Sequence, residues 1–237
     1  MARFLRFLLA LASLPFCAAL GRALWVAVFT SEELRTANGL PAGAVAFCGG
    51  FVLFFVLALV CPSPVRTYVL GHELTHAVWG LAFGARVSNI KVAATGGSVL
   101  LSKSNVWITL APYFFPFYTA LVALAALVTR LFVNPLPWPL AWTFAIGFTW
   151  CFHVYFTIHA LFQRQPDVLE YGRLFSWSFI WIANAVGILA ALCASTSLTF
   201  AGAAVIVRDA TCSAYAIAWS ACAAVFGMAA SLFRKGA

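Results

Sequence analysis

Two histidines and a glutamate, His72, Glu73 and His76, lie within five positions in the sequence HELTH, inside the apolar stretch 65–84. On a helix, positions i and i+4 share a face, so the two imidazoles can bind a single metal ion. Zinc fits such ligands, because it prefers nitrogen and carboxylate donors in a tetrahedron with one position left to water, whose pKa it lowers to about 7. Glu73 follows the first ligand and projects beside the ion, where we expect it to act as general base.

The alternative interpretation is that the two histidines are core residues, hydrogen-bonded to neighbouring groups. The chain has only four His and six acidic residues, yet three of these ten lie within five positions. Ionisable groups in apolar segments are energetically costly and usually mark a functional site. The pattern therefore favours a catalytic metal site.

The stretch GHELTHAVWGLAFG resembles the first core helix of the site-2 protease family, which comprises intramembrane zinc metalloproteases. The segment after it, with Gly96-Gly97, is similar to the membrane-associated strands that follow that helix in the family. The stretch ITLAPYFFPFYTALVAL, with Pro112, resembles the second core helix. The resemblance covers residues 67–184. It implies an enzyme that cleaves peptide bonds of membrane-protein substrates within the bilayer, with Zn²⁺ as cofactor.

The resemblance also implies a third metal ligand, which in the family is an aspartate well downstream, typically in an LDG setting. Only three acidic residues follow the glycine pair: Asp167, Glu170 and Asp209. Asp209 is next to Arg208, and we expect the two to form an ion pair in a short loop. Asp167 lies in QPDVLEYGRLF, which departs from the family pattern by separating the aspartate from the following GR by four residues. We assign Asp167 as the third ligand in preference to Glu170, for which we expect a surface position near Arg173.

Two further histidines, His153 and His159, lie in the segment CFHVYFTIHALF. A spacing of six residues places them on different faces of a helix, so a shared metal ion is not expected. We expect hydrogen bonds in the core or at the membrane interface for both. A contact with a metal ligand or with substrate stays open for either.

The composition indicates an integral, multi-pass membrane protein, with the cell membrane as the expected location. Hydrophobic residues make up 64% of the 237 residues and charged residues 8%, against about 25% charged in soluble domains. The net charge of +8 comes from basic residues at the ends of apolar runs, which help to orient spans, so it does not indicate nucleic-acid binding. The seven cysteines form no CxxC pair, and we interpret them as packing residues.

A spanning helix needs roughly 20 apolar residues, and the sequence predicts an all-α bundle of about six to seven such helices. The segments expected to span are 42–61, 65–84, 106–129, 138–162, 174–207 and 210–233, with an uncleaved N-terminal helix or signal anchor as a seventh. The segment 174–207 is too long for one ordinary span. The STSLT sequence at its residues 195–199 is expected either to break it or to let it tilt.

The connection 85–104 has short β-branched runs on both sides of Gly96-Gly97. This pattern is typical of a small hairpin, which would lie at or in the membrane, although a plain polar loop is an equal alternative. Such a hairpin offers a strand edge to which an extended peptide can add.

The sequence predicts one membrane domain over residues 1–237. Within it we expect N-terminal accessory helices in 1–64, a metalloprotease-like core in 65–184 and C-terminal accessory helices in 185–237.

The function expected from these features is that of an intramembrane zinc metallopeptidase whose partners are a membrane-protein or peptide substrate and the lipid bilayer. One alternative is a zinc-binding membrane protein without proteolytic activity, such as a chaperone or regulator; Glu73 favours the enzyme, since a structural site needs no general base. Another is a small metal or proton transporter, which would carry polar residues along several helices and an internal repeat. The sequence has neither.

Overall fold

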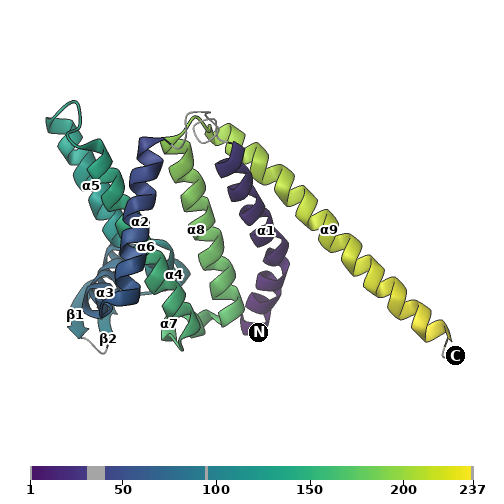
Figure 1. The fold of residues 1–237 in the computed structure, drawn as a ribbon. Helices are drawn as coiled ribbons and strands as arrows, with labels where there is room; N and C mark the ends of the chain where they lie inside the picture. Colours follow the sequence, from purple (N-terminus) through teal and green to yellow (C-terminus); the bar gives the residue numbers. More distant parts are fainter. Residues whose placement is uncertain (1, 31–40, 94–95, 236–237) are drawn as a thin grey trace. The chain divides into compact units, whose positions relative to one another are not determined.

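The computed structural model describes residues 2–30, 41–93 and 96–235, and these residues form nine helices and one two-stranded sheet (Figure 1). The predominantly helical fold and the small hairpin confirm these two parts of the predicted fold class. The chain divides into two compact units, one of Leu40–Ile180 and one of Met1–Gly39 with Trp181–Ala237.

The first of these units contains all of the residues singled out by the HELTH motif and its expected third ligand. Its elements are α2 Ala42–Val60, α3 Val65–Ala82, β1 Val87–Ala93, β2 Gly96–Leu101, α4 Val106–Phe114, α5 Phe117–Phe132, α6 Pro139–Phe162, α7 Pro166–Tyr171 and the first part of α8 Arg173–Ser195. The other unit contains α1 Ala2–Thr30, the rest of α8 and α9 Phe200–Lys235.

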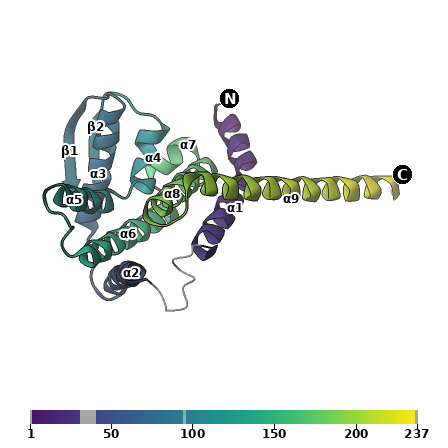
Figure 2. The ribbon, with the colours of Figure 1, turned by 90° about the horizontal axis from the view of Figure 1, so that it is seen from above.

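The hairpin predicted within 85–104 is present as strands β1 and β2, which pair antiparallel and lie against α3 (Figure 2). Val87 pairs with Leu101 at the open end, and Val92 pairs with Gly97 near the turn. Residues 94–95, between the strands, lie outside the described residues. The hairpin therefore follows the motif helix directly and packs back onto it.

Five of the described helices are long and apolar enough to cross a membrane: α1, α2, α6, α8 and α9. A sixth crossing is added if α4 and α5, which are bent by 75° at their junction, count as one. These helices fit a multi-pass membrane protein. Helix α3 is not among them, contrary to the expectation for 65–84, because Arg66 and the ionisable groups of HELTH lower its mean hydropathy.

The predicted boundaries of 106–129 and 210–233 are wrong, whereas 174–207 breaks within STSLT, which is one of the two alternatives expected for it. The segment 106–129 is not one helix, because Pro116 has no N–H for continuing the ladder and α4 ends at Phe114. The segment 174–207 breaks at residues 196–199, where the Thr199 hydroxyl accepts a hydrogen bond from the Gly202 N–H and caps α9. Arg208 and Asp209 consequently lie within α9 and not in a loop, although they form the expected exposed ion pair at 2.8 Å.

Helices α2 and α6 pack closely because a glycine on each helix faces the backbone of the other helix. A Cβ atom added at Gly50 of α2 would overlap the carbonyl oxygen of Phe144, and one added at Gly147 of α6 would overlap that of Phe47. Beside this crossing, Phe54, Cys151, Phe152 and Phe156 form a buried apolar cluster. All seven cysteines are free. Cys151 is buried and Cys17 and Cys193 are half-buried, whereas the other four are exposed, so the structure supports a packing role for at most three of them.

In the other unit, small residues of α1 pack against α8 and α9. Leu20 and Ala27 join Ala185 and Leu189 in one buried cluster. The Arg22 guanidinium donates a hydrogen bond of 3.0 Å to the hydroxyl of Ser213. The predicted N-terminal helix is thus a packed element of this unit.

The glycine crossing of α2 and α6 leads to a testable prediction. We expect Gly50→Ala and Gly147→Ala each to destabilise the protein by about 1–3 kcal/mol, because the added methyl group must push two backbones apart. The measurement is the thermal unfolding midpoint of the purified protein in detergent. Gly43→Ala is the matched control in α2, since nothing lies within 4 Å of its added Cβ. Equal midpoints for the Gly50 and Gly43 variants would contradict the close packing.

Candidate metal centre

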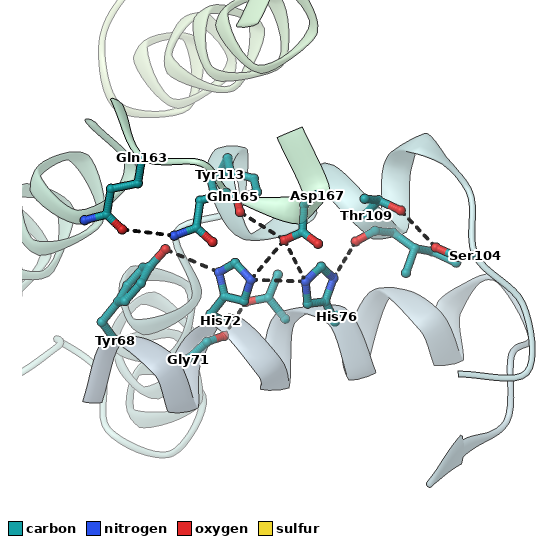
Figure 3. A network of polar contacts seen from close by, with 12 residues as sticks. Tyr68, Gly71, His72, His76, Ser104, Thr109, Tyr113, Gln163, Gln165 and Asp167 are labelled. Carbon is teal, nitrogen blue, oxygen red and sulfur yellow. Dashed lines mark hydrogen bonds and ion pairs between the residues drawn. The ribbon is translucent and has the colours of Figure 1, made fainter. Parts of the chain in front are cut away.

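Helix α3 presents the two histidines one turn apart on a single face. It begins directly after Pro64, and it ends in a left-handed glycine, Gly84, at φ 72°. The N–H of Ala85 returns to the carbonyl of Gly80 at 2.8 Å, which satisfies one of the last helical carbonyls. Figure 3 shows the rings of His72 and His76 directed from this helix toward α7.

A carboxylate from α7 completes a compact triangle of potential ligand atoms. Asp167 Oδ2 lies 3.2 Å from His72 Nε2 and 3.5 Å from His76 Nε2, and the two Nε2 atoms lie 3.2 Å apart (Figure 3). Within the described part of the chain, these three residues form a group of the kind that could hold a metal ion. Asp167 follows His72 by 95 positions in the sequence and His76 by 91, yet the fold brings it into direct contact with both.

Asp167 is held in place by its neighbours in the six-residue helix α7. Pro166 opens the helix, where its fixed φ suits the first turn. Val168, only 1% exposed, packs into the cluster of Leu110 and Ile180. The Ser176 hydroxyl donates a 2.9 Å hydrogen bond to the Val168 carbonyl. The carboxylate next to this anchored residue therefore has a defined position.

Tyr113 of α4 also orients Asp167, and the sequence analysis missed it. Its hydroxyl donates a 2.9 Å hydrogen bond to Asp167 Oδ2, and its side chain is fully buried. A tyrosine in an apolar helix is a usable signal, because a buried hydroxyl normally has a hydrogen-bond partner. The sequence does not say which partner, because tyrosine hydroxyls also donate to backbone carbonyls, as those of Tyr118 and Tyr215 do here.

The hydrogen bond at the far side of His76 decides which ring nitrogen carries the proton. His76 Nδ1 lies 2.8 Å from the carbonyl oxygen of Ile108, and a carbonyl can only accept. Nδ1–H is therefore the donor, and in the neutral ring Nε2 presents a lone pair. That lone pair faces Asp167 Oδ2 and His72 Nε2. Such an arrangement is repulsive unless a proton or a cation lies between these atoms.

The size of the triangle fits a small tetrahedral cation. Zinc binds histidine nitrogen and carboxylate oxygen at about 2.0–2.1 Å, which places two ligand atoms of a tetrahedron about 3.3 Å apart. The three observed separations of 3.2, 3.2 and 3.5 Å lie close to this value. The donor set of two imidazoles and a carboxylate is also one that zinc accepts.

Asp167 lies outside the candidate membrane spans and is ionised in this setting. Burial opposes its charged form, but hydrogen bonds from His72 and His76 in their protonated, charged form hold the pKa of this carboxyl well below its usual range. The carboxylate therefore supplies a negative charge that protons on the imidazoles, or a bound cation, would balance.

Glu73 lies beside the triangle and is not part of it. Its side chain is 6% exposed, because strand β2 covers it. A Cβ atom added at Gly97 would lie 2.6 Å from Glu73 Cγ and 2.7 Å from Val69 Cγ1. Only glycine fits at this point of the hairpin, so the backbone of β2 closes over the carboxylate.

The remaining predicted residues lie elsewhere. Glu170 is exposed on α7 and is not one of the three grouped residues. His159 is exposed, and its ring packs on Tyr155 with centroids 4.5 Å apart.

His153, in contrast, is buried and lines a small cavity of about 20 Å³ together with His72. That space is sufficient for one water molecule.

No protein-family model, curated protein or solved structure matches the chain. The likeness to site-2 proteases thus rests on the motif residues alone. The roles of His72, His76 and Asp167 as ligands and of Glu73 as general base stay predictions.

The ligand triangle predicts a specific pattern of metal loss. Purified protein is expected to contain about one zinc per chain, and Asp167→Ala should reduce that content severely, since two imidazoles alone hold zinc weakly. Glu170→Ala is the matched control on the same short helix and should retain the metal. Metal analysis of the folded variants checks this. Full zinc content in the Asp167 variant would remove Asp167 from the ligand set.

Proposed function

We propose that this chain is an intramembrane zinc metallopeptidase of the cell membrane, which hydrolyses peptide bonds of membrane-protein substrates. The observation that carries the proposal is the triangle of His72 Nε2, His76 Nε2 and Asp167 Oδ2, with edges of 3.2–3.5 Å. Those edges match three corners of a zinc tetrahedron.

The number of ligands favours a catalytic site over a structural one. Structural zinc sites are closed by four protein ligands, whereas catalytic sites keep one position for water. Among the described residues, the group offers three histidine or carboxylate ligands and no fourth. When bound, zinc would polarise the scissile carbonyl and make a water molecule acidic at neutral pH.

The remaining chemistry falls to the residues around the triangle. Glu73 is the group that accepts the proton of the attacking water and returns it to the leaving amine. Tyr113 keeps the Asp167 carboxylate aimed at the imidazoles through its 2.9 Å hydrogen bond. Because these groups are buried, their charges act in a medium of low dielectric constant, where electrostatic stabilisation is strong.

The hairpin is the element that would present the substrate. Its two strands pair only with each other among the described residues, so each has an outer edge available to an extended peptide. Strand β2 touches Glu73 through Gly97, which places one strand directly against the proposed general base. A substrate segment bound in extended form has its carbonyl groups exposed for attack, unlike a helical segment.

Glu73→Gln is the direct test of this function. The substitution keeps shape and polarity but removes the proton acceptor, so zinc content should stay near one per chain while cleavage is lost. The measurement is mass spectrometry of products from a library of apolar peptides in detergent micelles. Glu170→Gln serves as the control and should cleave normally. Unchanged cleavage by the Glu73 variant would exclude the proposed mechanism.

Gly97→Ala tests the contact between the hairpin and Glu73. The added methyl group must displace either the carboxylate or the strand, so we expect cleavage to fall about tenfold or more, as is typical for a small misplacement of a catalytic group. Zinc content should be retained, because none of the three ligands touches Gly97. Ser98→Ala, an exposed position on the same strand, is the control. Equal activity of both variants would show that β2 does not position Glu73.

A further inference from the structure

Helix α4 contains a proline, which leaves one backbone carbonyl of the helix without an N–H donor from within the helix. In an α-helix, the N–H of each residue donates to the carbonyl four residues before it. Pro112 lies inside α4 and has no N–H, so the carbonyl of Ile108 receives no such hydrogen bond. This carbonyl belongs to a residue that is only 1% exposed.

A buried carbonyl without a hydrogen bond is unfavourable, and the partner here comes from α3. His76 Nδ1 donates to the Ile108 oxygen at 2.8 Å, a normal length for a strong N–H···O bond. The proline on one helix and the metal-binding histidine on the other are therefore linked through one oxygen atom.

This link makes the two histidines of the triangle unequal. His76 has an acceptor-only partner at Nδ1, which forces the proton onto that nitrogen and leaves Nε2 free to bind a cation. His72 Nδ1 has the Tyr68 hydroxyl at 3.4 Å, beyond the usual hydrogen-bond range, and a hydroxyl can donate as well as accept. Only His76 is thus held in its ligating form before any ion arrives.

We propose that Pro112 is a positioning residue of the metal centre, which pre-orients His76 by reserving the Ile108 carbonyl for its Nδ1–H. The inference rests on the proposed metal site, but it concerns a residue that touches neither the ion nor the substrate. A proline at this position keeps the Ile108 carbonyl available for His76, since any other residue would supply an N–H that competes for it.

The test is Pro112→Ala, which restores that N–H. The N–H competes for the Ile108 oxygen and loosens the imidazole, so we expect zinc affinity to fall about 10- to 100-fold, as for other hydrogen-bond partners of metal-bound histidines. Zinc affinity is measured by competition with a chelator, and folding by circular dichroism. The control is Pro15→Ala, which alters another proline inside a helix, in the other unit. It should leave the affinity unchanged.

A second measurement reads the tautomer without any metal. In ¹⁵N-histidine-labelled protein with neutral imidazoles, His76 should be protonated at Nδ1 in the wild type and a mixture of tautomers in Pro112→Ala. The chain has four histidines, so single replacements assign the signals.

Two results would overturn the inference: unchanged zinc affinity in a folded Pro112 variant, or a wild-type His76 protonated at Nε2. The second decides the matter even if the variant fails to fold. Failure of the wild type to bind zinc would refute the proposed function instead, and the tautomer of His76 would still test the role of Pro112.

Discussion

The mutual approach of three electron-rich atoms is the constraint on which the site depends. Two imidazole nitrogens and a carboxylate oxygen lie 3.2–3.5 Å apart in a largely enclosed site, where water screens them less than at an open surface. Without a proton or a cation between them, these atoms would repel one another. Hydrogen bonds hold two of the three in place, from His76 to the Ile108 carbonyl and from the Tyr113 hydroxyl to Asp167, and the strand with Gly97 covers the neighbouring Glu73. A proton on an imidazole relieves this repulsion at one edge of the triangle, and a bound cation would relieve it at all three.

The two helices that face α3 across the site, α4 and α7, are short. Helix α4 has nine residues and α7 has six, and isolated helices of such length are not stable in water. Their order comes from the buried cluster in which Leu110 and Tyr113 of α4 pack against Val168 of α7. Tyr113 belongs both to this cluster and to the hydrogen-bond network around the carboxylate. A change in the packing of this cluster is therefore expected to move the Asp167 carboxylate relative to the two imidazoles. Such support from a well-packed neighbourhood is what keeps a functional site in its working geometry.

The parts of the site that the sequence predicts are those governed by local geometry or by scarcity. The pairing of His72 with His76 follows from the helical repeat. Asp167 was chosen as the third ligand from only three acidic residues that follow the glycine pair. The hairpin followed from β-branched runs around a glycine pair. The contacts of Tyr113, the Ile108 carbonyl and Gly97 could not be predicted, because they join elements far apart in sequence. The predicted helix ends were wrong in two places. The continuous apolar pattern gave no sign of the bend between α4 and α5, and the polar residues 208–209 were interpreted as a loop although they lie within α9.

The buried side of helix α3 carries the polar groups of the motif beside small apolar residues, and its exposed side carries large apolar side chains as well as Arg66. Thr75 and His76 are buried with Glu73, whereas Val78 and Leu81 are exposed. A helix at the surface of a soluble protein shows the opposite pattern, with its apolar stripe facing the core. In a lipid environment the reversed pattern is favourable, because large apolar side chains lose nothing by facing outward and each polar group finds its partner inside. The ionisable groups of the motif lower the mean hydropathy of α3, but they face α4, α7 and the hairpin. The helix can therefore still lie among apolar helices. The same partial enclosure lowers the effective dielectric constant around the Asp167 carboxylate, whose side chain is 24% exposed, and so strengthens its attraction for a positive charge.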